Sequence, residues 1–175
     1  MKLAIGTAQF GMNYGVANSI GQPDQNLASS IISYAKSNGI DTIDTAIAYG
    51  ESEKILGKVG VTDLNIITKL PEKPNNVSNV ARWVNEQVES SLIRLGKSSL
   101  SALLLHRPHQ LLESDNKDLW HTLLQLKSDK IVEKIGFSIY SPDELDKLWG
   151  SFQPDIFQAP YNIFDRRLTN SGWLK

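Results

Sequence analysis

Four side chains in the first two thirds of the chain could together carry acid–base chemistry. They are Asp44, Tyr49, Lys69 and His106. Three of them stand at or near the end of a short apolar run, and Tyr49 follows Asp44 by five residues. Because the carboxyl ends of successive parallel strands meet at one rim of a barrel, we expect these four groups to gather there.

A carboxylate, a phenol, an ammonium and an imidazole suit proton transfer to a small molecule. A free phenol is a weak acid, with a pKa of about 10. An ammonium about 4 Å away, at an effective dielectric constant near 20, favours the phenolate by roughly 4 kcal/mol, or about three pK units. We therefore expect Lys69 to lower the pKa of Tyr49 into a range useful for proton donation. Asp44 would pair with Lys69 and keep it charged, and a neutral His106 would orient a carbonyl oxygen.

Each of the four residues also has a purely structural interpretation. Lys69 could be a solvated strand end, and Tyr49 could pack in a tight loop. His106 could be a core histidine whose ring nitrogens are hydrogen-bonded within the protein, and Asp44 could cap the following helix. Their joint position on three consecutive strand ends is what favours a site.

The elements that must position these residues alternate along the chain. Short apolar runs followed by longer stretches of helical period are typical of βα units around a parallel sheet. The predicted strands are residues 3–7, 40–46, 64–70, 100–106, 131–138 and 156–160. The first predicted helix runs from Asp24 to a stop at Gly39, and a short second helix holds Ile55 and Leu56. Longer helices are predicted at 77–95, where Gly96 ends the helix, and at 115–129. A fifth helix begins at the capping box of Ser141 and Glu144, and a sixth begins at 168–175.

The fold class that fits this order is α/β, a (β/α)8 TIM barrel of which about six βα units are present. An open dinucleotide-binding sheet should show G-x-G-x-x-G after its first strand, and the early glycines at 6, 11, 15 and 21 do not have that spacing. Polar residues instead end successive runs, as barrel active sites require. Residues 1–175 are expected to form a single domain. A whole barrel needs eight strands and about 250 residues, so we expect a longer gene product, or a second chain covering the open edges.

Composition excludes several other classes. The chain has 175 residues, a net charge of −1 and no cysteine. Without a basic cluster, nucleic acid is not expected as a partner. No apolar run approaches the roughly 18 residues that a membrane span needs, and the first residues do not read as a signal peptide. The expected compartment is the cytoplasm.

The motifs are similar to those of the aldo-keto reductase family. Residues 44–50 read DTAIAYG, and they are followed by Glu53, by ITK at 67–69 and by LLHRP at 104–108. The resemblance covers essentially the whole chain. It implies that Tyr49 donates a proton, that Lys69 and Asp44 tune it, and that His106 orients the substrate. It also implies an oxidoreductase that moves a hydride from NADP(H), with NAD(H) as the alternative, to an aldehyde or ketone, without a metal.

The same resemblance implies cofactor-binding positions. They are Gly6, Thr7, Asp44, Ser138 and Gln158. One position departs from the family pattern, because Ile139 stands where the family has an asparagine that holds the nicotinamide carboxamide. Residues 14–18, YGVAN, resemble relatives found with nucleotide-sugar enzymes, so the carbonyl substrate could be small or sugar-derived.

Two other functions remain open at this stage. Ile139 and the missing barrel end are compatible with a catalytically impaired aldo-keto-reductase-like protein that binds a partner or senses the cofactor. A barrel lyase or isomerase could instead use Lys69 as a Schiff-base amine. Asp44 argues against that chemistry, because a carboxylate keeps the amine protonated.

Overall fold

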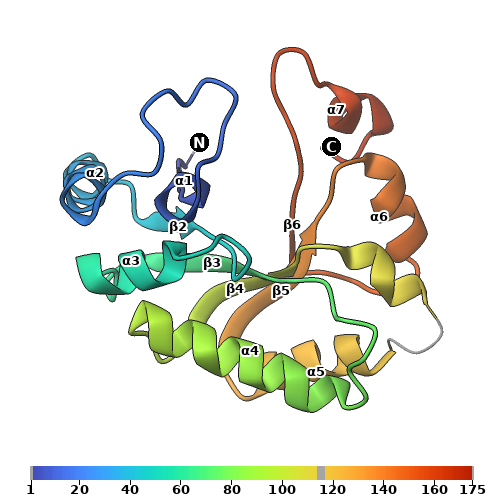
Figure 1. Cartoon of the computed structure of the whole chain (residues 1–175). Coiled ribbons are helices and arrows are strands. Elements are labelled where there is room, and N and C mark those ends of the chain that lie inside the picture. The colour runs from blue at the N-terminus through green and yellow to red at the C-terminus, as the bar shows by residue number, and fades with distance from the viewer. Residues whose placement is uncertain (1, 114–116, 175) are drawn as a thin grey trace.

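Six parallel strands form one curved sheet in a computed structural model that describes residues 2–113 and 117–174 (Figure 1). The spatial order of the strands follows the chain, from β1 to β6. The strands are β1 (Ile5–Gly6), β2 (Thr42–Asp44), β3 (Asn65–Leu70), β4 (Leu100–Leu105), β5 (Val132–Ser138) and β6 (Ile156–Gln158). Sequential parallel pairing through helical crossovers is the arrangement of a (β/α)8 barrel, and the curled sheet has six of the eight strands of such a barrel.

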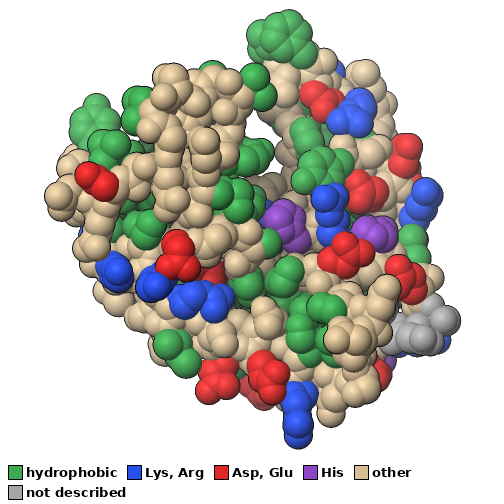
Figure 2. Space-filling view, in the orientation of Figure 1, with side chains coloured by type: hydrophobic (Ala, Val, Ile, Leu, Met, Phe, Trp, Pro, Cys, Tyr) green, Lys and Arg blue, Asp and Glu red, His purple; other side chains and the backbone are tan. Residues whose placement is uncertain are grey.

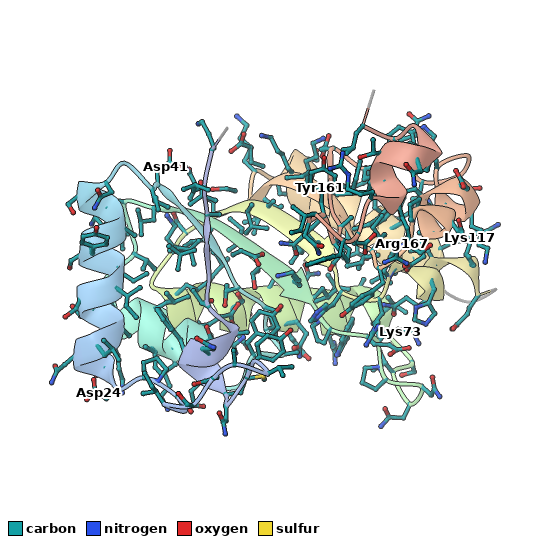
Figure 3. All side chains as sticks on the ribbon, turned by 90° about the horizontal axis from the view of Figure 1, so that it is seen from above. Asp24, Asp41, Lys73, Lys117, Tyr161 and Arg167 are labelled. Atoms are coloured by element: carbon teal, nitrogen blue, oxygen red, sulfur yellow. The ribbon has the colours of Figure 1, made fainter. Side chains whose placement is uncertain are left out.

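The helices lie in the crossovers between the strands. They are α1 (Ala8–Gly11), α2 (Gln25–Ser37), α3 (Ser52–Val59), α4 (Val80–Leu95), α5 (Lys117–Ser128), α6 (Pro142–Leu148) and α7 (Arg167–Ser171), with a 3₁₀ turn at Pro108–Leu112. In Figure 1, α4 and α5 cover one face of the central strands. Seen from above in Figure 3, Asp24 at the start of α2 and Lys117 at the start of α5 lie at opposite edges of the molecule.

The strands form where the sequence predicts them, with shorter ends. The central strand β4 is the most deeply buried, with five of its six residues buried, as expected for a parallel strand covered on both faces. The first strand is reduced to two residues, because the chain turns into α1 directly after Thr7. Within the described residues, β1 pairs only with β2 and β6 only with β5. That a second chain covers these edges stays a prediction.

Local capping rules explain most helix ends. Asp24 accepts a hydrogen bond from the Leu27 backbone N–H, and Gly39 follows the helix with a left-handed φ of 75°. The capping box of Ser141 and Glu144 is present as predicted. Helix α4 begins later than predicted, at Val80, because Asn79 caps it. The predicted start at residue 115 and the predicted end at residue 175 lie outside the described residues.

Two short elements were not predicted, helix α1 and the 3₁₀ turn. Both are too short for a hydrophobic period to reveal them. Helix α1 lies against the loop that carries Tyr49. A methyl group on Gly11 would approach the Tyr49 carbonyl oxygen to 1.6 Å, so this contact requires a glycine.

No helix among the described residues is long and apolar enough to cross a membrane.

Candidate active site

The carboxyl ends of β2 to β6 converge on a hollow at one rim of the sheet. We call it the rim pocket; it has a volume of about 250 Å³. It is lined by Tyr49, Lys69, His106, Ser138, Ile139, Tyr140, Gln158, Ala159 and Pro160. Figure 2 shows this face of the molecule hollowed near its centre, with a histidine at the wall and basic side chains beside it. Three of the four predicted catalytic residues therefore line one pocket.

The fourth residue, Asp44, joins the group through Lys69. The Lys69 Nζ atom donates to the Asp44 Oδ1 atom at 2.7 Å and to the Thr45 carbonyl oxygen at 2.8 Å. The lysine side chain is 2% exposed and the aspartate side chain 20% exposed. This confirms the predicted pairing of the two residues.

Tyr49 lies over this ion pair and beside His106. The Lys69 Nζ atom is 5.1 Å from the centroid of the Tyr49 ring. The Tyr49 and His106 rings meet edge to face, with their centroids 5.8 Å apart at 78°. A phenol, an ammonium, a carboxylate and an imidazole thus lie within contact range, as their spacing predicts.

The predicted lowering of the Tyr49 pKa is wrong for this structure. Burial, and secondly the negative charge of Asp44, raise the pKa of Tyr49 to about 12. The predicted lowering of this pKa requires nearly the full electric field of the Lys69 ammonium at the Tyr49 hydroxyl. Asp44, at 2.7 Å from the ammonium, compensates most of that positive charge. A desolvated phenol beside a compensated ammonium keeps its proton.

His106 is a neutral hydrogen-bonding group at neutral pH. Burial first, and then the positive charges of Lys69 and Arg107, hold the pKa of His106 below its usual value, while Asp44 acts in the opposite direction. A neutral imidazole can donate one N–H to an oxygen in the pocket.

A second pocket of about 360 Å³ shares Tyr49 with the rim pocket. It is lined by Gly6, Thr7, Ala8, Gln9, Tyr14, Gly15, Asp44 and Tyr49. A methyl group on Gly6 would meet no atom within 4 Å, so there is open space beside this residue. The Thr7 hydroxyl is buried; it donates to the Asp44 carbonyl oxygen at 3.1 Å and accepts from Ser52 Oγ at 3.0 Å. The hydroxyl of Thr7 therefore links the end of β2 to the start of α3 beneath this pocket.

Comparison with known proteins decides the family. A model of the aldo/keto reductase family matches residues 2–175. This chain belongs to that family. The resemblance seen in its motifs is thereby confirmed.

Individual relatives agree with this assignment. The chain is 32% identical over 163 residues to aldo-keto reductase YhdN of Bacillus subtilis, covering 86% of this chain and 48% of the relative. A crystal structure of PA4992 from Pseudomonas aeruginosa, named as an aldo-keto reductase, has a TM-score of 0.78 and 28% identity over 95% of this chain and 66% of that one. The glycerol dehydrogenase AKR11B4 of Gluconobacter oxydans has a TM-score of 0.69 and 26% identity over 95% of this chain and 53% of that one. This aldo/keto reductase chain spans about half the length of the curated relatives it matches.

Two polar residues of the rim pocket fit the carboxamide of a nicotinamide. Ser138 and Gln158 are partners across the β5–β6 ladder, and both line the pocket. Neither side chain has a hydrogen-bond partner within residues 2–113 and 117–174. A free hydroxyl and a free primary amide offer the donors and acceptors that a carboxamide can use. Beside them, Ile139 is 2% exposed and belongs to the apolar core, so its side chain adds no polar group.

Glu53 is a buried acidic residue whose role the sequence did not reveal. It is 2% exposed and lies on α3. Its carboxylate accepts from Thr68 Oγ1 and Ser91 Oγ at 2.7 Å each, and from Arg94 at 2.9 and 2.7 Å. All of its partners come from β3 and α4, so Glu53 fixes the helices behind the site and is not available for chemistry.

Tyr14 and Tyr140 flank Tyr49 and were not predicted as site residues. Tyr14 lines the second pocket and Tyr140 the rim pocket. Tyr140 follows the end of β5 by two residues, and that position was the only signal in the sequence.

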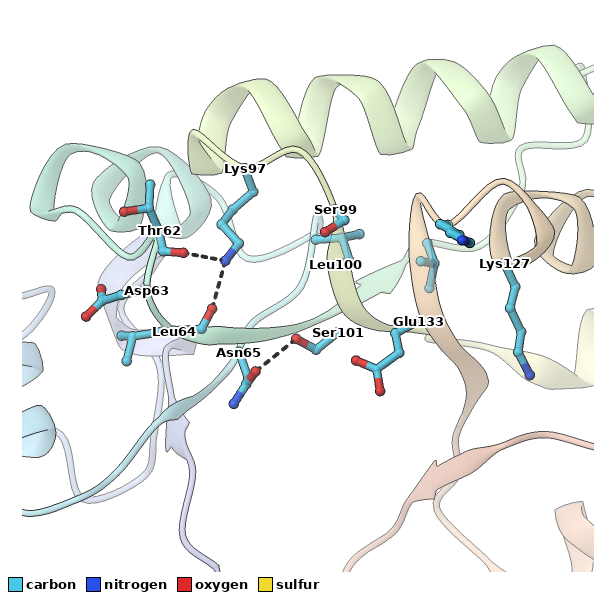
Figure 4. A pocket seen from close by; sticks show the side chains of 12 residues that line it. Thr62, Asp63, Leu64, Asn65, Lys97, Ser99, Leu100, Ser101, Lys127 and Glu133 are labelled. Carbon is cyan, nitrogen blue, oxygen red and sulfur yellow. Dashed lines mark hydrogen bonds between the residues drawn. The ribbon is translucent and has the colours of Figure 1, made fainter.

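Another hollow, of about 620 Å³, lies at the amino ends of β3, β4 and β5 (Figure 4). Two of the three Nζ donors of its Lys97 are already used, because they bind the Thr62 and Leu64 carbonyl oxygens at 2.8 and 2.9 Å. Active sites of this fold form at the opposite end of the barrel, so we assign no chemistry here. Among the described residues, no group of three or more acidic, histidine or cysteine side chains could hold a metal ion.

Proposed function

We propose that this aldo/keto reductase reduces an aldehyde or ketone to an alcohol, with Tyr49 as the proton donor. The observation that supports this most directly is the edge-to-face contact of Tyr49 with His106 above the Lys69–Asp44 pair. In this arrangement one carbonyl oxygen in the rim pocket could receive a proton from the phenol and a hydrogen bond from the imidazole.

The protonation states suit this direction of reaction. With a pKa of about 12, Tyr49 holds its proton at neutral pH. The hydride adds to the carbonyl carbon, the Tyr49 proton goes to the carbonyl oxygen, and solvent then reprotonates the tyrosine. The Lys69 ammonium lies 5.1 Å from the centroid of the Tyr49 ring, and the part of its field that Asp44 leaves uncompensated favours the phenolate that forms. His106, kept neutral, orients the oxygen without competing as an acid.

The cofactor in this proposal is NADP(H), with NAD(H) as the alternative. When bound, it supplies the hydride. Ser138 and Gln158 would hold its carboxamide, and the open space beside Gly6 would admit the ring. The likeness to a protein named a glycerol dehydrogenase supports a small hydroxylated or sugar-derived carbonyl as substrate.

The test is hydride transfer to a panel of aldehydes by the wild-type protein and by Tyr49→Phe. Loss of a general acid lowers the rate by about 100- to 10,000-fold, and we expect that loss in kcat. Tyr34→Phe is the matched control, because Tyr34 is exposed on α2, away from both pockets.

Equal rates for the wild-type protein and Tyr49→Phe would defeat the proposal. The four tryptophans provide a parallel measurement of cofactor binding by fluorescence. Cofactor binding without turnover of any aldehyde would instead favour a binding or regulatory protein.

A further inference from the structure

Arg107 is a cation beside two residues of the rim pocket, His106 and Tyr140, and the proposed reaction does not use it. It follows His106 directly and is exposed at the carboxyl end of β4. Its backbone is fixed, because its carbonyl oxygen accepts from Gln110 Nε2 at 2.9 Å. Its guanidinium carbon lies 5.3 Å from the centroid of the Tyr140 ring, in cation–π geometry.

Among the residues that the structure describes, no carboxylate is paired with this guanidinium. Within residues 2–113 and 117–174, no acidic oxygen lies within 4.0 Å of it. Two acidic groups near the rim are occupied elsewhere. Asp44 is paired with Lys69, and Glu144 accepts from the Tyr140 and Ser141 backbone N–H groups at 2.7 and 3.0 Å. With respect to the described part of the chain, Arg107 is therefore a positive charge without a paired carboxylate beside the pocket.

Tyr140 determines where the Arg107 guanidinium lies relative to the pocket. Tyr140 is half exposed and lines the rim pocket together with Tyr49 and His106. The Arg107 guanidinium stacks on the Tyr140 ring. The field of Arg107 reaches the His106 imidazole, since it contributes to lowering the pKa of that residue. A molecule with its carbonyl oxygen between Tyr49 and His106 would thus extend past Tyr140 toward Arg107.

We propose that Arg107 binds an oxyanion, a carboxylate or a phosphate, on the carbonyl substrate. This inference rests on the proposed carbonyl reduction and names its substrate class: aldehydes or ketones that carry a negative charge a few bonds from the carbonyl. A guanidinium matches both oxyanions because it offers parallel N–H donors in a fixed fork. Stacking on Tyr140 holds that fork in place before the substrate arrives, which lowers the entropy cost of binding.

The test compares charged and neutral aldehydes of similar shape. One pair is 4-carboxybenzaldehyde and 4-nitrobenzaldehyde; the other is glyceraldehyde 3-phosphate and glyceraldehyde. For each pair, kcat/KM with cofactor and the dissociation constant without cofactor, by calorimetry, are measured for the wild-type protein, Arg107→Gln and Arg107→Lys. Arg82→Gln on α4 is the control, because it removes an exposed arginine far from the pocket.

We expect the wild-type protein to prefer the charged member of at least one pair, and the pair that shows the preference tells carboxylate from phosphate. Hydrogen bonds to charged groups contribute enough that Arg107→Gln should lower the charged-over-neutral ratio about 10- to 100-fold. Arg107→Lys should retain part of it, since the charge stays and the fork is lost. Arg82→Gln should leave the ratio unchanged.

A ratio that does not differ between the wild-type protein and Arg107→Gln in either pair, by both measurements, overturns the inference. The proposed reduction fails separately. If charged aldehydes bind in an Arg107-dependent way but none is reduced, the oxyanion site stands without the reaction. If Tyr49→Phe abolishes reduction while Arg107→Gln changes no ratio, the reaction stands without the oxyanion site.

Discussion

The Lys69 ammonium lies 2.7 Å from the Asp44 carboxylate, and the pair is nearly closed off from solvent on the lysine side. The two residues are 25 positions apart and come from neighbouring strands β2 and β3. The contact compensates a buried charge, and it also removes most of the field that the lysine would exert on Tyr49. The same ion pair therefore determines both the stability of the rim and the acidity of the phenol.

Removing one partner of this pair should destabilise the fold. Asp44→Asn removes the negative charge that compensates the buried Lys69 ammonium and leaves it only neutral acceptors, the new amide oxygen and the Thr45 carbonyl oxygen. An uncompensated buried charge costs about 3 kcal/mol or more, so we expect a loss of that size in the free energy of unfolding, measured by urea denaturation. Asp63→Asn is the control. Its pair with Lys36 is exposed, and such pairs contribute little. Similar small losses in both variants would contradict the role given to Asp44.

Tyr49 should titrate well above an ordinary tyrosine. Its pKa is raised to about 12 by burial and by Asp44. The folded state thus holds this proton more tightly than the unfolded state. The stability that follows is fully present below about pH 10 and is lost as the pH rises toward 12. The difference in phenolate absorbance between the wild-type protein and Tyr49→Phe isolates this one group.

A midpoint near 12 in that difference titration would agree with the structure. A midpoint below 10 would show that the positive charge of Lys69 outweighs burial and Asp44 in determining the pKa of Tyr49. Tyr34→Phe, which removes an exposed tyrosine far from the site, is the control for the loss of one phenol.

Glu53 should matter for stability and not for chemistry. Glu53→Ala would leave Thr68, Ser91 and Arg94 without their shared acceptor. Breaking such a buried network costs about 3 to 5 kcal/mol, and we expect this loss in thermal or urea unfolding. Glu51→Ala, two residues earlier, removes an exposed carboxylate paired with Lys54 and should change little. A Glu53→Ala protein as stable as Glu51→Ala would show that the network contributes nothing.

Much of this molecule could be predicted from local sequence rules. The alternation of apolar runs and helical periods identified the six strands, because each run has to be buried on both faces of a parallel sheet. The Ser141 and Glu144 capping box and the Asp24 cap were predictable because both partners lie within three residues. The four site residues were predictable because strand ends of consecutive βα units must meet at one rim.

Only the tertiary structure decided the electrostatics of the site. Whether Lys69 lowers the pKa of Tyr49 depends on how much of its charge Asp44 has already compensated, and that depends on a distance between two strands. Glu53 became a structural residue because three donors from β3 and α4 reach it. The position of Arg107 over Tyr140 brings together two residues that are 33 positions apart (140 − 107). Sequence alone specified which groups reach the rim, since backbone periodicity is local. Their charges and partners required the fold, because Coulomb and hydrogen-bond energies depend on separation in space.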